Sequence, residues 1–527
     1  MIRVEKRGAV IRKFGLAIVG AAIVASVPGL AAGPVPALPP EARKVVDEAK
    51  YRNARWGLHV ADLKTGEVLF DWNGDQRFLA ASTTKLWAGA AALDAYGADF
   101  RFTTPIYRTG TVEGGTLNGN LVMVASADPT MGGRTTPQGT IDFTPIDHIY
   151  AVTLPLATLT PENPLAGLDD LAKQVAASGI RRVAGDVIID ARLFPAMEKD
   201  GYIVSPVWIN DNLIDLTVTP GTAGSKATVV SRPLTAAFTV ESDVTTVAAG
   251  QPLTVAVASP RPGVISVTGN IPAGREPLVQ AHQVSDPPAF ARTLLVEALK
   301  RHGVTVDANP LGANPDSALP PKGSYRSDAE VAKLVSPPFS ENIKLIFKVS
   351  HNQHADLLIF LLALKHGETS FDDGLTKIRD FVKKRGIDPG LVSLSDGRGN
   401  EYTDLFSPRT VTTLLRAEAK GRDAKPYHHA FPILGVDGSE KDTVPASSRI
   451  AGKAFLKSGT TVAGDGMNQR AIIMTRGLAG YMKGKSGREM VVAIYVTDVP
   501  LGEDMIPQLL KVIEDQGVIL EYVYDRT

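Results

Sequence analysis

The sequence predicts a mixed helix-and-strand (α+β) domain that is split by a long, mostly β insert. The chain has 527 residues, more than one core needs, because domains usually contain roughly 100 to 200 residues. Helical and strand-like segments occupy both ends of the chain, whereas short β-branched runs broken by Gly, Pro and Asp fill the middle. A hairpin near the start can pair with strands near the end, which would join the two ends in one domain.

Residues 1–33 have the pattern of an export signal. Basic residues precede an apolar run, Phe14 to Val27, and small residues follow it. We therefore expect the mature protein to begin near Gly33 and to be periplasmic or secreted. A retained membrane anchor, with weak membrane association, is the alternative, because the run is barely long enough to cross a bilayer of about 30 Å.

Composition excludes several function classes. The 56 basic residues balance the 56 acidic ones, which removes the long-range attraction that a nucleic-acid-binding protein uses. We expect no nucleic-acid partner. Cysteine is absent, so the sequence excludes disulfides, a thiolate metal site and a cysteine nucleophile.

The first part of the chain should form a helix, a hairpin and a second helix. A hairpin is indicated by two alternating runs joined at a short turn, and the second helix has a glycine stop. The expected elements are a helix from Glu41 to Tyr51, strands from Trp56 to Leu63 and from Glu67 to Trp72, and a helix from Lys85 to Tyr96 ended by Gly97.

The domain boundaries are predicted from the change in character along the chain. We assign residues 34–99 and 336–527 to the split domain and 100–335 to the insert, which would form two further domains, with a smaller β domain nested at about 230–285. Within the insert we expect strands near Thr254 to Val257 and Val264 to Val267, and a helix near Leu168 to Ala177. The elements expected after the insert are helices Asn342–Val349, Ala355–Lys365, Phe371–Arg385 and Pro408–Ala419, strands Ile450–Lys457, Ala471–Thr475 and Met490–Thr497, and a last helix Met505–Tyr522.

Ser82 and Lys85 are the first candidate catalytic pair. A serine hydroxyl is a poor nucleophile until a base lies within hydrogen-bonding reach, and residues i and i+3 share one face of a helix. Ser82-Thr83-Thr84-Lys85 places such a pair at the start of a helix. The alternative is an N-capping serine followed by a solvated lysine.

A serine/lysine mechanism also needs a second polar pair and a further lysine. Ser350-His351-Asn352 lies between two expected helices, and we prefer it to Ser340-Glu341-Asn342, which can cap a helix. Of three Lys-Ser/Thr-Gly triplets, Lys457-Ser458-Gly459 ends a strand-like run, and Gly459 would let the substrate backbone approach closely. The triplets beginning at Lys64 and Lys485 fit hairpin turns.

These motifs, in this order and with a domain-sized stretch between the first two, resemble the class C low-molecular-mass penicillin-binding proteins of the penicillin-binding protein 4 group. The resemblance covers nearly the whole mature chain. Other stretches that are similar to this family are Ser126–Thr130, Gly185–Asp190, Asn210–Gly221, Asp396–Gly399, Gly435–Gly438 and Leu478–Tyr481.

The resemblance implies a penicillin-recognising serine hydrolase domain, with an antiparallel sheet packed by helices, that acts as a D-alanyl-D-alanine carboxypeptidase or endopeptidase on peptidoglycan stem peptides. β-Lactam antibiotics would be covalent inhibitors, and no metal or cofactor is implied. By the same resemblance Ser82 is the nucleophile and Lys85 its base, while Asn352 orients Lys85 and the substrate amide. Ser350 and Lys457 would relay a proton and hold the terminal carboxylate. Substrate contacts are implied for Ser458, Gly459, Thr460, Asp190 and Phe194.

The sequence departs from this family where the third residue of the stem peptide would bind. Members that recognise diaminopimelate carry an arginine and a glutamine there, and this chain has Tyr402 and Val462. The segment from Thr460 to Gly477 is also longer than usual and includes the glycine-rich Gly464–Gly466.

Other functions stay open at this point. A β-lactamase or D-amino-acid esterase would use the same acylation, and a non-catalytic cell-wall-binding protein could keep the fold. His351 and His354 have a spacing open to metal ligands, but no third ligand is near in the sequence, so we interpret them as loop and helix-surface residues. The sequence decides neither the oligomeric state nor the preference for carboxypeptidase or endopeptidase activity.

Overall fold

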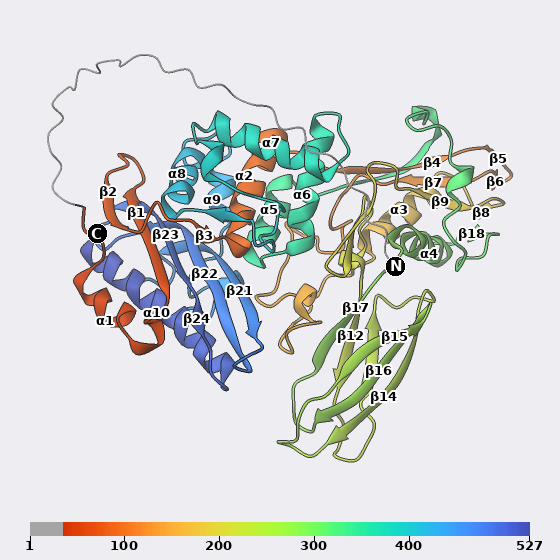
Figure 1. The fold of residues 1–527 in the computed structure, drawn as a ribbon. Coiled ribbons are helices and arrows are strands. Elements are labelled where there is room, and N and C mark those ends of the chain that lie inside the picture. Colours follow the sequence, from red (N-terminus) through yellow and green to blue (C-terminus); the bar gives the residue numbers. More distant parts are fainter. Residues whose placement is uncertain (1–34) are drawn as a thin grey trace, which may run out of the picture. The chain divides into compact units, whose positions relative to one another are not determined.

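The computed structural model describes residues 35–527 (Figure 1). The predicted export signal and its alternative, a membrane anchor, lie outside the described residues. Among the helices of residues 35–527, none combines the length and the apolar character needed to cross a membrane.

An antiparallel sheet unites the two ends of the chain, as the sequence predicted. Its strand order is β2-β1-β23-β22-β21, and β24 also pairs with β22. The hairpin strand β1 pairs with β23 so that Leu58 lies opposite Ile494. The strands are β1 (Arg55–Asp62), β2 (Val68–Trp72), β21 (Ala454–Asp465), β22 (Arg470–Lys483), β23 (Glu489–Thr497) and β24 (Val499–Pro500).

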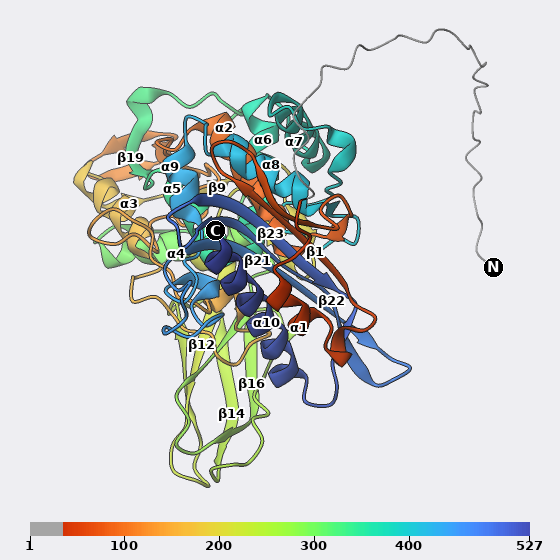
Figure 2. The same cartoon turned by 90° about the vertical axis from the view of Figure 1, so that its left-hand side faces the viewer.

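Helices cover both faces of this sheet because its strands alternate between two apolar cores (Figures 1 and 2). Along β23, Val491 packs in the core with helix α2, whereas Val492 packs in the core with α10, as a period of two requires. The first core is built from α2 (Lys85–Tyr96), α5 (Phe339–Lys348), α6 (Asn352–Lys365), α7 (Phe371–Lys384), α8 (Pro408–Glu418) and α9 (Ala424–Ala430). The second contains α1 (Arg43–Val46) and α10 (Met505–Arg526).

The insert contains several small sheets around a separate apolar core. Their orders are β19-β4-β7-β9, β18-β8-β6-β5, β13-β12-β17 and β14-β16-β15, and β10 pairs with β11. The strands are β4 (Thr103–Arg108), β5 (Thr111–Glu113), β6 (Thr116–Asn118), β7 (Leu121–Val124), β8 (Arg182–Val183), β9 (Val187–Asp190), β10 (Met197–Lys199), β11 (Tyr202–Val204), β12 (Leu213–Thr219), β13 (Thr228–Arg232), β14 (Thr239–Val247), β15 (Ala256–Arg261), β16 (Val264–Pro272), β17 (Leu278–Gln283), β18 (Thr305–Val306) and β19 (Glu330–Val335). Its helices are α3 (Ala166–Ala177) and α4 (Pro287–Arg301), and the sequence analysis missed α4. The exact boundaries of the inserted domains stay a prediction.

Three elements differ from the expectation. The segment 41–51 is one short helix, α1, flanked by 3-10 turns. So short a helix is marginal alone, and contacts with α10 hold the segment, since the Tyr51 hydroxyl donates to Asp515 at 2.7 Å. Helix α6 begins at Asn352 rather than at Ala355. Strands β21 and β22 run beyond the expected ends at Lys457 and Thr475 and form one long hairpin, so that most of the segment 460–477 is paired strand.

Candidate active site

Ser82 and Lys85 lie on consecutive turns of helix at the edge of the sheet. Ser82 is in a 3-10 turn, Ala81–Thr84, that continues into α2 at Lys85. Lys85 Nζ lies 2.8 Å from Ser82 Oγ and is fully buried. Burial, together with the positive charge of Lys457, lowers the pKa of Lys85 well below its usual range. A neutral amine within hydrogen-bonding distance of a serine hydroxyl can act as its base.

Two further acceptors fix the Lys85 amine. Nζ lies 2.8 Å from Asn352 Oδ1, at the start of α6, and 2.8 Å from the carbonyl oxygen of Arg398. That carbonyl belongs to the Asp396–Gly399 loop, where the buried Asp396 carboxylate accepts the N–H groups of Arg398 and Gly399. Gly399 has φ +88°, and a Cβ there would lie 1.7 Å from the Ala81 carbonyl oxygen. Only glycine lets this loop approach the Ser82 turn so closely.

Ser350 and Lys457 form a second hydrogen-bonded pair. Ser350 lies between α5 and α6, and Lys457 Nζ donates to its hydroxyl at 2.9 Å and to the Ser458 carbonyl at 2.6 Å. Burial lowers the pKa of Lys457 to about 7, an effect that Glu440 opposes and Arg476 increases. The group therefore changes charge near neutral pH.

Strand β21 brings the third motif beside the nucleophile. A Cβ on Gly459 would lie 2.7 Å from the Ser82 nitrogen and 2.9 Å from the Ala80 carbonyl oxygen. The glycine is thus required for contact between β21 and the Ser82 turn. Gly459 also lines a cleft together with Ser82, and its predicted role in the approach of a substrate backbone stays a prediction. β21 is the last strand of the sheet order. The segment 432–434 bonds its outer edge at Ala454 and Leu456. Beyond Leu456 no backbone hydrogen bond to that edge is found within residues 35–527, so a peptide could pair there.

These motifs surround a cleft of about 460 Å³, within the range of sites that bind small molecules. The lining residues are Ser82, Pro145, Ile146, Tyr150, Thr153, Leu154, Val349, Ser350, Asn352, Arg398, Gly399, Asn400, Ser439, Ser458, Gly459, Thr460 and Thr461. Three of the five predicted catalytic residues and the three predicted substrate contacts on β21 thus line the cleft. Lys85 and Lys457 are buried behind it and join it through their hydrogen bonds to Ser82 and Ser350.

A family model described as the D-Ala-D-Ala carboxypeptidase 3 (S13) family matches residues 42–514. The chain belongs to this family. It is a serine-type DD-peptidase of the class C penicillin-binding protein group, and the resemblance found in the sequence is confirmed.

Individual relatives agree with this assignment. The D-alanyl-D-alanine carboxypeptidase of Actinomadura sp. (strain R39) is 28% identical over 412 residues, which cover 74% of this chain and 69% of the relative. The D-alanyl-D-alanine carboxypeptidase DacB of Haemophilus influenzae is 24% identical over 465 residues, 85% of this chain and 86% of the relative. The crystal structure of penicillin binding protein 4 from H. influenzae superimposes with a TM-score of 0.67 at 20% identity, over 92% of this chain and 99% of that one. At that identity the superposition shows a shared fold.

Two residues assigned to the substrate lie elsewhere in this DD-peptidase. Asp190 forms a two-point ion pair with Arg192 and accepts a hydrogen bond from Tyr325 at 2.7 Å. Phe194 is buried and stacks on Phe360 with 4.3 Å between ring centroids. Neither lines the described cleft, so their proposed contacts with substrate gain no support from the geometry.

The alternative motifs also lie away from the cleft lining. Lys64 is in the turn between β1 and β2, and Lys485 is in the turn between β22 and β23, where it lies 3.9 Å from Asp525. Both lysines are exposed. Ser340 is in the first turn of α5.

Sequence reasoning missed the insert's contribution to the cleft. Tyr150 lines it, and the Tyr150 hydroxyl donates to the Ser350 carbonyl at 2.8 Å. Nothing in the local sequence marks Tyr150, because its partner is 200 residues away.

The two histidines after Ser350 are buried, not surface residues. His351 and His354 are fully buried, and their rings stack with 3.6 Å between centroids. The structure also supplies the third group that the sequence did not reveal, because Asp211 of the insert has a carboxylate oxygen within 4.8 Å of a nitrogen of each ring.

Proposed function

We propose that this enzyme is exported and cleaves peptidoglycan stem peptides through an acyl-enzyme on Ser82. It would remove a terminal D-alanine or cut a D-alanyl cross-link. The observation that carries the proposal is the position of the Lys85 amine, 2.8 Å from Ser82 Oγ and 2.8 Å from Asn352 Oδ1 in a fully buried site. Export rests on the sequence pattern of residues 1–33.

In the acylation step, Ser82 Oγ attacks the carbonyl carbon of the penultimate D-alanine. Neutral Lys85 takes the hydroxyl proton, and the low pKa of its buried amine supports this role. The backbone N–H groups of Ser82 and Thr460 would stabilise the oxyanion, a contact worth about 3 to 4 kcal/mol per donor in other hydrolases. Ser82 and Thr460 line the same cleft, which is consistent with this assignment.

Collapse of the intermediate breaks the C–N bond and leaves an ester on Ser82. The Ser350 hydroxyl would relay to the leaving nitrogen the proton that Lys85 took from Ser82, so that Lys85 is again neutral and Ser350 again a hydroxyl when the amine leaves. Lys457, hydrogen-bonded to that hydroxyl at 2.9 Å, would hold the terminal carboxylate as an ammonium ion. Water then hydrolyses the ester and regenerates Ser82. No step in this sequence needs a metal or cofactor.

The test is intact mass spectrometry of the mature protein after incubation with benzylpenicillin, compared with Ser82→Ala. A related structure, penicillin binding protein 4 of H. influenzae, has been solved with a β-lactam bound, and a β-lactam resembles the acyl-D-alanine bond. We expect a stable adduct of one penicillin on wild type and none on the variant, together with release of D-alanine from a D-Ala-D-Ala peptide. No adduct on wild type, or an equal adduct on Ser82→Ala, rejects the proposal, and rapid release of hydrolysed penicillin indicates a β-lactamase.

A further inference from the structure

The loop that carries Ser350 and Asn352 has an unfavourable backbone conformation. Ser350 has φ +59°, in the left-handed region that residues other than glycine rarely adopt. Such conformations persist only where the surroundings hold them. Here the conformation matters for chemistry, because Ser350 Oγ accepts from Lys457 and Asn352 Oδ1 accepts from Lys85.

Two contacts that hold this loop come from the insert. The Tyr150 hydroxyl donates to the Ser350 carbonyl at 2.8 Å, and burial raises the pKa of Tyr150 to about 12, so this hydroxyl keeps its proton at neutral pH. The other contact joins His351 Nε2 to Asp211 Oδ1 at 3.2 Å. His351 lies between Ser350 and Asn352 in the sequence. One contact is therefore made by Ser350 itself and the other by the residue that follows it.

The direction of the His351–Asp211 hydrogen bond follows from the second ring nitrogen. His351 Nδ1 accepts the backbone N–H of His354 at 3.3 Å, where it caps α6. Burial lowers the pKa of His351 to about 3, so the ring is neutral and carries its one proton on Nε2. That proton points to the Asp211 carboxylate, and the ring is fixed from both sides.

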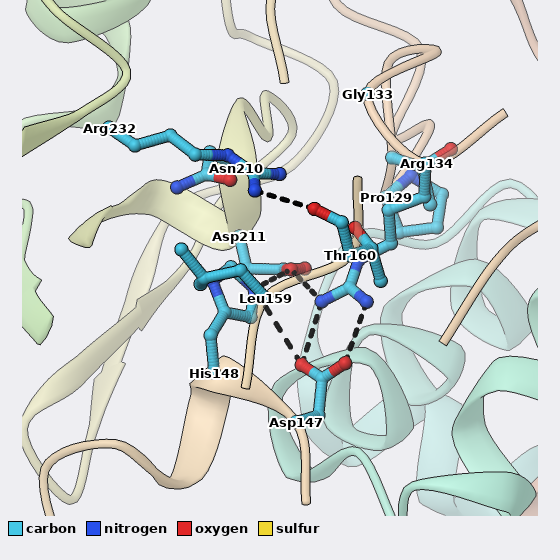
Figure 3. Close-up of a pocket in the computed structure, with 11 residues that line it drawn as sticks. Pro129, Gly133, Arg134, Asp147, His148, Leu159, Thr160, Asn210, Asp211 and Arg232 are labelled. Carbon is cyan, nitrogen blue, oxygen red and sulfur yellow. Dashed lines mark hydrogen bonds and ion pairs between the residues drawn. The ribbon is translucent and has the colours of Figure 1, made fainter. Parts of the chain in front are cut away.

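Asp211 is itself held firmly inside the insert (Figure 3). Its Oδ2 atom accepts from Arg134 at 2.8 Å and lies 2.8 Å from His148 Nε2. Arg134 also forms a two-point ion pair with Asp147 at 2.7 and 2.8 Å. Burial opposes the ionisation of Asp211, but Arg134 and the neighbouring histidines keep its pKa well below the usual range.

Asp211 reaches this position through a strained turn. Asn210, Asp211 and Asn212 have φ of 53°, 54° and 54°, three consecutive left-handed residues without a glycine. The Asn212 side chain makes two hydrogen bonds across this turn. Its Oδ1 atom accepts the Ile209 N–H group, and its Nδ2 atom donates to the Val207 carbonyl oxygen. Strained backbone of this kind is found mainly at functional sites, which is consistent with a role for the Asp211 side chain.

A metal site is the rival explanation for Asp211, His351 and His354. Two features favour the hydrogen-bonded network. Arg134 and His148 already occupy the Oδ2 atom of this carboxylate. His351 Nε2 carries a proton where a ligand needs a lone pair.

We propose that Tyr150 and Asp211 of the insert are positioning residues, which hold the Ser350–Asn352 loop in the conformation that acylation of Ser82 requires. This inference rests on the proposed acyl-enzyme function. The two residues would act on catalysis indirectly, because they fix the geometry of Ser350 and Asn352 without touching the substrate atoms that react.

The test compares Tyr150→Phe and Asp211→Asn with wild type in full-length mature protein. Tyr150→Phe removes one hydroxyl and keeps the ring, and Asp211→Asn keeps the side-chain size but removes the charge. We expect each to lower the acylation rate constant for benzylpenicillin about tenfold to a hundredfold, because small displacements of catalytic groups have effects of this size. The apparent Kd of the non-covalent complex should change less than about threefold.

Matched controls separate positioning from folding. Tyr107→Phe alters an insert tyrosine that stacks on Tyr325, and Asp307→Asn alters the surface ion pair with Arg182; both should acylate like wild type. Thermal unfolding shows whether each variant is folded, and the final adduct mass shows whether all of its active sites react.

The outcomes separate the inference from the proposed function. If wild type forms its adduct and both variants acylate at the wild-type rate, the inference is wrong and the proposed function stands. An absent adduct on wild type rejects the proposed function itself. A slow rate explained entirely by a smaller fraction of folded enzyme also overturns the inference. So does loss of wild-type acylation in EDTA that Zn²⁺ restores, since that result establishes a metal site.

Discussion

Lys457 Nζ donates to the Ser350 hydroxyl at 2.9 Å, which joins strand β21 to the loop between α5 and α6. Burial lowers the pKa of Lys457 to about 7. Below this pH the group is an ammonium ion that attracts a terminal carboxylate, and above it the charge is lost. The pair is therefore sensitive to pH in the neutral range.

This titration predicts a pH dependence that differs between two substrates. For a peptide with a free terminal D-alanine carboxylate, kcat/KM should fall as pH rises above about 7, by roughly tenfold or more when the charge is lost. The matching D-alanine amide lacks the carboxylate and should not show this decline. Parallel pH profiles for the two peptides test the prediction. An equal decline for both would assign the titration to the chemical step rather than to carboxylate binding.

A second prediction concerns which lysine belongs to the third motif. Lys457→Ala should lower the acylation rate by on the order of a hundredfold, as loss of a group involved in proton transfer does. Lys64→Ala and Lys485→Ala serve as controls, because both lysines are exposed in hairpin turns. Stopped-flow acylation by a chromogenic β-lactam provides the rates. A defect at Lys485 with Lys457→Ala unaffected would overturn the assignment.

Gly459 gives a third prediction, based on space alone. In Gly459→Ala the new methyl group would lie 2.7 Å from the Ser82 nitrogen, so β21 or the Ser82 turn must move. We expect acylation to slow about a hundredfold, since a displacement of about 1 Å has such an effect. Gly464→Ala is a matched control on the same strand, where a Cβ would meet nothing within 4 Å. Similar rates for the two variants would show that the close approach is not needed.

The sequence predicted those parts of the molecule that depend on local pattern. The alternation of residues 56–63 indicated β1, and Gly97 correctly ended α2 at Tyr96. The motifs around Ser82, Ser350 and Lys457 were found because each is a short run of residues. Their order along the chain pointed to the family likeness, which in turn implied the antiparallel sheet packed by helices.

What the sequence missed depends on contacts between distant segments. The Tyr150–Ser350 and Asp211–His351 contacts join residues that are 200 and 140 positions apart. Asp211 also depends on a left-handed turn at Asn210–Asn212, which no glycine marks. The interpretation of His354 as a surface residue was wrong because residues of the distant insert, Trp208 and Asp211, bury it. Charge and spacing alone did not reveal this packing.

The last prediction concerns the third residue of the stem peptide. Tyr402 and Val462 occupy the places where diaminopimelate-recognising family members carry an arginine and a glutamine, and their side chains are 66% and 40% exposed, outside the cleft lining. Gln469 and Arg470, which could have replaced these donors, bond within the β21–β22 hairpin to Gly466 and Asp465.

Arg398 is the arginine in the described cleft lining, but its guanidinium is already engaged. It donates to Asp396 at 3.2 Å and to Tyr202 at 2.9 Å, and it forms an ion pair with Asp200. A guanidinium that is neutralised by the protein's own carboxylates contributes little to binding another. The described cleft therefore provides no free charged clamp for a diaminopimelate carboxylate.

We thus expect the enzyme to depend little on a free carboxylate at this position. A charge-assisted hydrogen bond contributes about 1.5 to 3 kcal/mol, so its absence removes roughly tenfold to a hundredfold of selectivity. Values of kcat/KM for D-Ala-D-Ala peptides containing diaminopimelate, amidated diaminopimelate or lysine should agree within about tenfold. A larger preference for free diaminopimelate would contradict the prediction. In that event Arg398→Lys would show whether this guanidinium leaves its partners to bind the substrate, because the preference would then fall while acylation by benzylpenicillin persisted.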